Sequence, residues 1–476
     1  MKQSAEGTLR KSYPVFDCDA HVNDPLDIWD KYVEPEYREL VKQAYWRDER
    51  QALINGHIKV TGGSDAEFGW NWNPITISGP GLNKKLLRRL RDVPMTPEQR
   101  RYLRHEGAYD PRARLKDMDL MGIDQVLVIP TMLVDHFLFI ENHHAANALA
   151  RAYNNWVYDW CKTSPDRLYP AAILPVQNTV FAVQELHRVA KMGFRVALVR
   201  PIDAQGNYPN RIYMPPRPET LNTAFWDPIY RAFEETSIVL GIHTFPHPSG
   251  TASGPVARSP GEYVNNTSYG TGRWVNHQSL SFVFEAMTWT AQILLSGFLD
   301  RYPKLRMAIF ESNCSWLPEL LEHCDRLFKL YANERARPTE TNAFVRDPMY
   351  KPPKRLPTEA FYSQALIAFE GDELDAFRQW ERFQDIGIWS SDAYHSDGSG
   401  AWVAIRNMEE LEVPESAQAM LMGANARRFY GIEGKTFVTD EPKAIPRPAW
   451  FPKQDEEFEK WWEKTANPRK YSVGPR

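Results

Sequence analysis

The sequence has few of the features that mark a secreted or membrane protein. Its 476 residues include four cysteines, Cys18, Cys161, Cys314 and Cys324, which form no Cys-x-x-Cys pair and no regular framework. We therefore expect a reduced, cytoplasmic protein. The first residues, MKQSAEGTLRKSYP, lack the apolar stretch of a signal peptide. No run of about 18 apolar residues occurs, so no membrane span is expected.

The sequence also lacks a charge excess and the common nucleotide-binding motifs. The net charge is -4 and 25% of the residues are charged, so nucleic acid and anionic membrane are not expected partners. There is no Gly-x-Gly-x-x-Gly, no P-loop and no Gly-x-Ser-x-Gly. Dinucleotide binding, nucleotide hydrolysis and serine-hydrolase chemistry therefore have no support, and a small-molecule substrate is expected.

Aromatic residues and proline are abundant, with 16 Trp, 21 Tyr and 36 Pro. They can fill a large core, line a pocket or form a subunit interface, and composition does not separate these. The segment 436–476 carries many prolines together with Trp450, Trp461 and Trp462. We expect it to form a C-terminal arm that packs on a neighbouring subunit of a homo-oligomer. Packing on its own barrel is the alternative.

Short apolar runs alternate with longer helical patterns along the chain. Such nearly continuous apolar runs are typical of parallel strands buried on both faces. The expected strands are Tyr13–Cys18, Gln125–Pro130, Tyr169–Pro175, Val196–Arg200, Ile238–His243, Arg306–Glu311, Phe361–Leu366 and Ile388–Ser391. The expected helices are 147–163, 180–192 (with Gly193 as C-terminal cap), 226–235, 317–331 and 414–429. Eight alternations predict an α/β fold of the TIM (β/α)8 barrel type.

The predicted barrel occupies residues 12–435 and contains three long segments outside the basic pattern. A large insertion, residues about 24–110, follows the first strand, and residues about 247–280 follow the fifth. Residues about 332–358 precede the seventh strand. Segments that follow barrel strands lie at the C-terminal face, where TIM-barrel active sites form. We therefore expect the first two to border the active site.

The segment FDCDAH (16–21) places acidic and imidazole side chains at the end of the first strand. Because strand side chains alternate between faces, Asp17, Asp19 and His21 point the same way. Asp19 and His21 could therefore offer an oxygen and a nitrogen to one metal ion. A turn-capping aspartate beside a surface histidine is the alternative. Asp17 could support a ligand or cap the strand end.

Two further strands end in residues of the same kinds. His243 ends the fifth strand and Asp392 follows the eighth. Alone, His243 could be a core histidine bonded to backbone, and Asp392 could be a helix N-cap. Together, three strand ends converge on one barrel mouth. Two imidazoles and two carboxylates suit a single divalent ion, Zn2+ first, with Mn2+ or Fe2+ as alternatives.

Several segments resemble the amidohydrolase-related family that includes the aminocarboxymuconate-semialdehyde and γ-resorcylate decarboxylases. The resemblance runs from about Val15 to Gly431. Its segments are DCDAHVNDP (17–25), YDPRARLKDMDLMGIDQVLVIPT (109–131), SPDRLYPAAILPVQ (164–177), SGFLDRYPKLRMAIFES (296–312) and ANARRFYGI (424–432). The resemblance implies a metal-dependent enzyme with the ligands Asp19, His21, His243 and Asp392.

The sequence departs from this family at the end of the sixth strand. The family's decarboxylases usually have a histidine there, whereas this chain has Glu311. A carboxylate can act as a general base towards a metal-bound water. We therefore expect a hydrolase of the amidohydrolase superfamily that cleaves a C–N or C–C bond of a small aromatic or conjugated substrate, with Asp392 or Glu311 as proton acceptor. Glu311 could instead hold a metal ligand or an arginine.

The alternative chemistry is non-oxidative decarboxylation of an aromatic or unsaturated carboxylate, with Asp392 as proton donor to the substrate carbon. Three further residues are candidates for substrate binding. Arg200 ends the fourth strand and could meet a carboxylate, or neutralise acidic groups at the rim. His277 lies in the long segment after the fifth strand. His395 could orient substrate or be a partly exposed loop histidine.

Overall fold

A computed structural model shows that eight parallel strands form the centre of the molecule. Their order around the sheet is β1-β5-β6-β7-β8-β9-β10-β11. The strands are β1 (Phe16–Val22), β5 (Gln125–Pro130), β6 (Leu168–Ile173), β7 (Val196–Val199), β8 (Val239–His243), β9 (Met307–Phe310), β10 (Ala365–Glu370) and β11 (Gly387–Ser390). The structure describes residues 8–48, 51–61, 96, 106–199, 223–243, 279–280, 282–330, 353–395, 398–443 and 449. The predicted TIM barrel is confirmed.

The first and last strands close the barrel where the candidate ligands lie. Ala20 and Ala393 form a parallel bridge, and the Asp392 amide donates to the Asp19 carbonyl at 3.0 Å. The His21 amide donates to the Ala393 carbonyl. Main-chain bonds therefore hold the two segments that carry candidate ligands side by side, although Ala20 and Ala393 are 373 residues apart in sequence.

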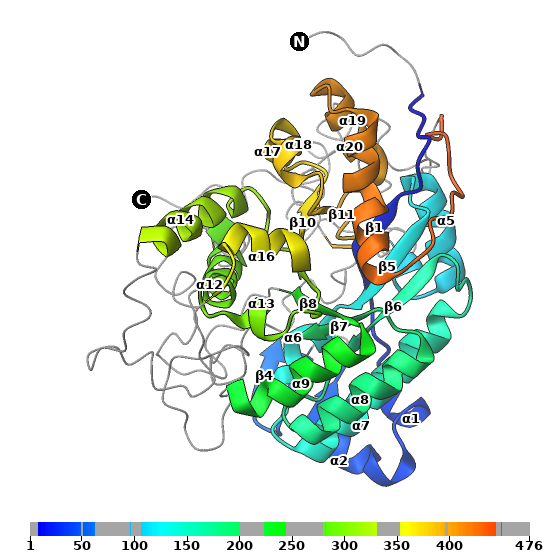
Figure 1. The fold of residues 1–476 in the computed structure, drawn as a ribbon. Helices are drawn as coiled ribbons and strands as arrows, with labels where there is room; N and C mark the ends of the chain where they lie inside the picture. Colours follow the sequence, from blue (N-terminus) through cyan, green and yellow to red (C-terminus); the bar gives the residue numbers. More distant parts are fainter. Residues whose placement is uncertain are drawn as a thin grey trace, which may run out of the picture.

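Helices surround the strands, and Figure 1 shows α7, α8 and α9 side by side along one flank. Asn142 and Asn178 cap α7 and α8 through their side-chain oxygens, and Gly193 ends α8 in the left-handed conformation, as predicted. The helices around the barrel are α5 (Pro111–Met121), α7 (His143–Cys161), α8 (Thr179–Met192), α9 (Thr223–Thr236), α12 (Phe282–Leu295), α13 (Phe298–Arg301), α14 (Leu317–Leu330), α16 (Pro357–Gln364), α17 (Leu374–Arg378), α18 (Trp380–Phe383), α19 (Ala401–Glu410), α20 (Glu415–Ala419), the π-helical η7 (Met420–Ala424) and α21 (Asn425–Tyr430). Within the described ranges, no helix has both the length and the apolar character needed to span a bilayer.

The predicted insertion after β1 contains a small antiparallel sheet in the order β2-β3-β4. A hairpin joins β3 to β4 through Asn55 and Gly56, which both adopt positive φ. The described elements are α1 (Ile28–Lys31), η1 (Pro35–Tyr37), α2 (Arg38–Ala44), β2 (Tyr45–Arg47), β3 (Gln51–Ile54), β4 (Ile58–Thr61) and η3 (Glu106–Ala108). After β5, α6 (Met132–His136) and η4 (Phe137–Phe139) continue this side of the barrel mouth.

Two predicted strands differ from the observed ones. Most of the predicted seventh strand, Phe361–Leu366, is the end of α16, and the strand begins only at Ala365. Pro357 occupies the first turn of α16, and the Leu356 amide donates to the Glu359 carboxylate, so the local sequence begins a helix there. The predicted first strand, Tyr13–Cys18, instead runs from Phe16 to Val22, because its pairing with β5 extends as far as Pro130.

The segments 8–15 and 435–443 meet at the bottom of the barrel, opposite the strand ends that carry the candidate ligands. Lys11 is 3% exposed and its Nζ contacts the Asp124 carboxylate at 2.5 Å and the Val438 carbonyl. The Asp124 carboxylate also accepts the amides of Val15, Phe437 and Val438 at 2.6–2.8 Å. We call this arrangement the Asp124 clasp.

The first residues of the predicted C-terminal arm continue from the Asp124 clasp along the N-terminal segment. The Lys11 amide donates to the Thr439 carbonyl, and the Glu441 amide donates to the Leu9 carbonyl, both at 2.9 Å. Residues 436–443 therefore lie against their own barrel. The remainder of the arm falls outside the described residues, except for residue 449, and its contact with another subunit stays a prediction.

Candidate metal centre

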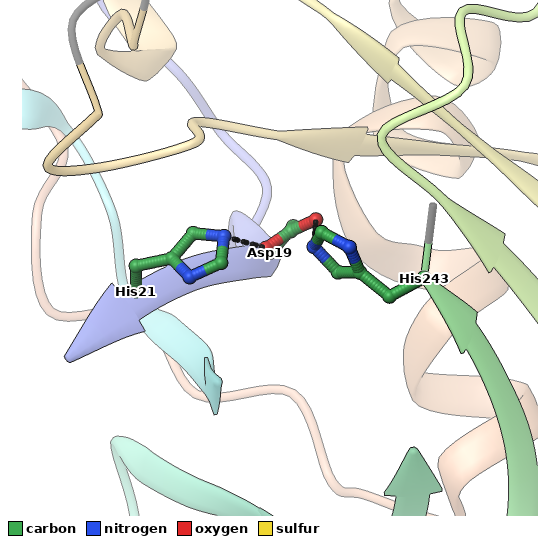
Figure 2. Close-up of side chains that lie close together, drawn as sticks. All are labelled: Asp19, His21 and His243. Carbon is green, nitrogen blue, oxygen red and sulfur yellow. Dashed lines mark ion pairs between the residues drawn. The ribbon is translucent and has the colours of Figure 1, made fainter. Parts of the chain in front are cut away.

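Three candidate ligands converge at the C-terminal ends of β1 and β8 (Figure 2). Asp19 lies between the two histidines: its Oδ1 is 3.3 Å from His21 Nε2 and its Oδ2 is 3.2 Å from His243 Nε2. All three residues are at most 1% exposed. One ligand atom from each lies within 4.8 Å of the others, which is the spacing of a metal-binding triad. The strand register therefore brings two imidazoles and a carboxylate to one point.

Asp392 and His395 form a second group that shares His21 with the first. Asp392 Oδ1 lies 3.5 Å from His21 Nε2 and 2.8 Å from His395 Nδ1. The His395 ring stacks on the His21 ring with centroids 3.8 Å apart. Asp392 is 2% exposed, and its φ of 49° turns the chain sharply after β11. Asp19 and Asp392 thus each place a carboxylate oxygen within 3.5 Å of His21 Nε2, and His21 belongs to both groups.

The surroundings of His21 fix which of its ring nitrogens faces the centre. Its Nδ1 lies 3.1 Å from the Pro130 carbonyl oxygen, an acceptor, so Nδ1 carries the hydrogen and Nε2 has the lone pair. Burial lowers the pKa of His21 well below its usual range, and the nearby His395 and His243 lower it further. A neutral imidazole with a free lone pair is the form that binds metal ions.

Asp17 supports the site from the seam between β1 and β11. Its Oδ1 accepts the amides of Asp19 at 3.2 Å and Ser391 at 2.9 Å, and its Oδ2 accepts the Ser391 hydroxyl at 2.5 Å. Burial raises the pKa of Asp17 to about 7, and these hydrogen bonds partly offset the rise. Asp17 therefore links Asp19 to Ser391, the residue before Asp392, through hydrogen bonds. It was a candidate for such a supporting role, whereas Ser391 was not singled out from the sequence.

The residues present fit a divalent metal ion. Among the described residues, Asp19 Oδ1 and His21 Nε2 are buried and make no hydrogen bond, although they face each other. Burying polar atoms without partners is costly, and a cation between them satisfies both. Nitrogen and oxygen donors in this combination suit Mn2+, Zn2+ or Fe2+.

Glu311 lies on the other side of His243 from Asp19. It follows β9 with a φ of 43°, and its Oε2 is 3.5 Å from His243 Nδ1, whereas Nε2 of the same ring faces Asp19. Its side chain is 12% exposed, more than any of the predicted ligands. A carboxylate at the outer nitrogen of a ligand histidine orients the ring and raises its basicity. The geometry thus agrees with the alternative in which Glu311 holds a metal ligand.

Two predicted substrate-binding residues, Arg200 and His277, lie outside the described residues. His395, the third, lies beside His21 and Asp392, and its side chain is 14% exposed. Arg114 is a further neighbour of the site that was not singled out from the sequence. Arg114 of α5 donates a hydrogen bond to the His21 carbonyl. Its sequence signal was a charged residue on the helix face that also carries the buried Met118 and Met121.

Comparison with known proteins identifies the family. The amidohydrolase family model matches residues 16–432, which is most of the chain. The chain belongs to the amidohydrolase family. The resemblance inferred from the sequence segments is therefore confirmed.

Relatives of this amidohydrolase include a γ-resorcylate decarboxylase from Rhizobium radiobacter. It is 24% identical over 333 residues, which cover 68% of this chain and 87% of the relative. Among solved structures, an amidohydrolase from Mycobacterium avium subsp. paratuberculosis K-10 matches with a TM-score of 0.61 and 19% identity, covering 88% of this chain and 100% of the other. A dihydroxybenzoic acid decarboxylase from Polaromonas sp. JS666, solved with manganese and 2-nitroresorcinol, matches with a TM-score of 0.52 and 16% identity, covering 88% and 97%. The structural matches establish the barrel fold.

These relatives change the balance between the two predicted chemistries. Hydrolysis was the first expectation and decarboxylation the alternative. Two of the three relatives named above are decarboxylases, which is the alternative chemistry, whereas the Mycobacterium avium structure is named only as an amidohydrolase. For the metal, the sequence analysis placed Zn2+ first, whereas the dihydroxybenzoic acid decarboxylase holds manganese.

Proposed function

We propose that this amidohydrolase is a metal-dependent, non-oxidative decarboxylase of a small aromatic or unsaturated carboxylate. The observation that carries the proposal is the position of Asp392, a buried carboxylate between the candidate ligand His21 and the partly exposed His395. Such a carboxylate can take part in metal binding and also deliver a proton. The activities of the named relatives support the same chemistry.

Asp19, His21, His243 and Asp392 are the residues that would hold the ion. When bound, a divalent ion supplies a Lewis acid for an oxygen of the substrate. Mn2+ is the first ion to test, because a structural relative was solved with it. Zn2+ is the second, because two imidazoles and two carboxylates suit it equally well.

Asp392 is the proposed proton donor. In the reaction, the bond between the substrate carbon and its carboxylate breaks, CO2 leaves, and the carbon keeps the electron pair and accepts a proton. Asp392 delivers this proton and regains one from His395, whose Nδ1 is 2.8 Å away. The side chain of His395 is 14% exposed, although its Nε2 atom is buried. No oxidant or reductant is needed.

Glu311 orients His243 in this proposal. The support is its contact with His243 Nδ1, the nitrogen that faces away from Asp19. Hydrolysis remains the second candidate function, because this chain has a carboxylate after β9 and the side chain is 12% exposed. As a general base, Glu311 would need to reach a water molecule at the metal rather than the ring of a ligand.

The test is a screen of hydroxylated aromatic carboxylic acids, aromatic amides and esters with the purified protein in heavy water and in 18O-labelled water. Decarboxylation releases CO2 and places deuterium on the substrate carbon, with no 18O in the organic product. Removal of metal with a chelator should abolish the activity, and Mn2+ or Zn2+ should restore it. A product that carries 18O without CO2 release would contradict the proposal and establish hydrolysis.

Asp392→Asn tests the proton donor in the same assay. Asparagine keeps the shape but cannot donate an acidic proton, so kcat should fall by about 10^2–10^4-fold. Asp385→Asn, an exposed carboxylate before β11, is the control and should leave kcat unchanged. An Asp392→Asn variant with near wild-type kcat would remove this residue from the mechanism.

A further inference from the structure

We propose that two residues of α5, Arg114 and Asp117, are positioning residues that set the geometry of the metal site from outside the barrel. The inference rests on the metal site proposed above. It concerns residues three positions apart on a helix that contributes no ligand. One acts on β1 and the other on the segment that follows β11.

Arg114 holds the main chain of His21. Its side chain is among the largest that are fully buried, and its Nη2 donates to the His21 carbonyl oxygen. Its Nε donates to the Gly107 carbonyl at 2.9 Å. The guanidinium group lies over the rings of Tyr394 and Trp160, 4.6 and 5.4 Å from their centroids. A planar group with fixed donors and two stacked rings cannot shift without moving the backbone of His21.

Asp117 holds the segment that carries Asp392 and His395. Its Oδ2 accepts the hydroxyl of the buried Tyr394 at 2.6 Å. Tyr394 lies between Ala393, whose carbonyl accepts the His21 amide, and His395. A hydrogen bond from a tyrosine to a buried carboxylate is short and strong, so it fixes the ring and the adjoining backbone. Asp117 therefore acts on the position of both Asp392 and His395.

The packing around this pair leaves little room for adjustment. A Cβ atom added at Gly107 would lie 2.1 Å from Asp117 Oδ2 and 2.2 Å from the Tyr394 hydroxyl. Only glycine can therefore bring the η3 backbone against these groups. Since Arg114 also stacks on Tyr394, the two contacts form one unit that joins β1 to the segment after β11. This unit lies where β1, which carries Asp19 and His21, meets the segment that carries Asp392 and His395.

The experiment measures the affinity of the metal-free protein for Mn2+, by titration against a chelating indicator. Tyr394→Phe removes the hydroxyl that Asp117 holds and keeps the ring. We expect its Kd for Mn2+ to rise about 10–100-fold, the effect seen when groups that orient ligands are changed. Tyr302→Phe is the matched control. It removes a similar hydrogen bond, from the buried Tyr302 to Asp227 at 2.7 Å, in the helical layer away from the site. It should lose comparable thermal stability and keep wild-type Mn2+ affinity.

Arg114→Lys tests the other half of the unit. Lysine keeps the charge but loses the planar pair of donors and the stacking, so we expect a similar loss of Mn2+ affinity. Arg167→Lys is its control, because Arg167 also donates to two carbonyls, of Asp124 and Ile123, and lies over an aromatic ring, but at the bottom of the barrel. It should not change the affinity. Asp117→Asn keeps an acceptor for Tyr394 and should stay within about threefold of the wild-type Kd, a partial rescue relative to Asp117→Leu.

The outcomes separate this inference from the proposed function. If the wild type binds neither Mn2+ nor Zn2+, the proposed function fails and the inference fails with it. If the wild type binds and Tyr394→Phe and Arg114→Lys bind as tightly as their controls, only the inference is overturned. If one of these two variants does not fold, the other and Asp117→Leu give the decision, since an affinity loss confined to this unit is required.

Discussion

Glu311 is the residue at which decarboxylation and hydrolysis make different predictions. Glu311→Gln keeps an acceptor for His243 Nδ1 but removes the negative charge. If Glu311 orients His243, we expect Mn2+ affinity to fall by about tenfold and saturating Mn2+ to restore most of kcat. If Glu311 is a general base, kcat should fall about 10^2–10^4-fold with unchanged Mn2+ affinity. Mn2+ titration and kcat at saturating Mn2+ decide the matter.

Glu319→Gln is the control for this measurement. Glu319 is an exposed glutamate in the first turn of α14, the helix that follows the same strand. Neither quantity should change in this variant. A Glu311→Gln enzyme that keeps its metal and loses its turnover would return hydrolysis to first place.

At the residue scale, the sequence predicted which candidate ligands lie together, but it did not predict the residues that surround them. The structure brings the candidate ligands Asp19, His21 and His243 together, as expected from the rule that strand ends in a barrel share one mouth. The side of His243 on which Glu311 lies depends on the φ of 43° at Glu311, which no local pattern predicts for a glutamate. The partner of Arg114 is a backbone carbonyl 93 residues away in sequence, so it has no sequence signature.

At the element scale, Glu373 ties the segment after β9 to the end of β10. Its carboxylate is partly buried and accepts the amides of Cys314 at 2.9 Å and Glu370 at 3.0 Å. Burial raises the pKa of Glu373 from 4.5 to about 7, although these amides lower it in part. The folded state therefore holds this proton more tightly than the unfolded state does.

The consequence is a loss of stability as pH rises. Between about pH 4.5 and pH 7 the folded protein binds more protons at Glu373, so the free energy of unfolding falls through this window and levels off above it. The contribution is about 3 kcal/mol, from 1.36 kcal/mol per pKa unit. Glu373→Gln should remove this slope, as measured by urea unfolding at pH 5 and pH 8. Asp375→Asn, an exposed carboxylate on α17, is the control. An equal slope in Glu373→Gln and wild type would refute the assignment.

Elements were predictable where the local pattern and the tertiary environment agreed. β5 was predicted with its observed bounds because its six residues are all buried and, apart from Gln125 at the start, all apolar. The seventh strand was misplaced because the segment 361–366 (FYSQAL) resembles a strand in its apolar residues. Pro357 and Glu359, just before it, begin a helix that continues to Gln364. The hairpin of β3 and β4 has a local signal, Asn55-Gly56, but it lies outside the alternating strand and helix pattern of a barrel.

At the scale of the whole molecule, the Asp124 clasp joins the two ends of the described chain. Lys11→Met should lower the free energy of unfolding by about 3 kcal/mol, because it leaves a buried carboxylate without its cation. The loss stays at the low end of the usual range because three amides still donate to Asp124. Urea unfolding at pH 7 measures it, and Mn2+ affinity should not change, since the clasp lies at the opposite end of the barrel.

Lys435→Met is the control for the clasp. Lys435 pairs with Asp166 at 2.7 Å, but their side chains are 41% and 60% exposed. Exposed pairs contribute about 0–1 kcal/mol, so little stability should be lost. If both substitutions lowered the free energy of unfolding equally, the Asp124 clasp would contribute no more stability than an exposed ion pair.

The pairing beside the clasp also decides how the protein responds to a mechanical load. Leu9 bonds to Glu441 and Lys11 to Thr439, in antiparallel fashion, so tension between residues 8 and 443 reaches the Leu9–Glu441 pair first. A pulling force applied to these two segments therefore breaks the hydrogen bonds one after another instead of shearing them all at once. The force then acts on the ion pair between Lys11 and Asp124, which must break before the segments separate further. Once that point yields, the tension passes directly to β1, the strand that carries Asp19 and His21.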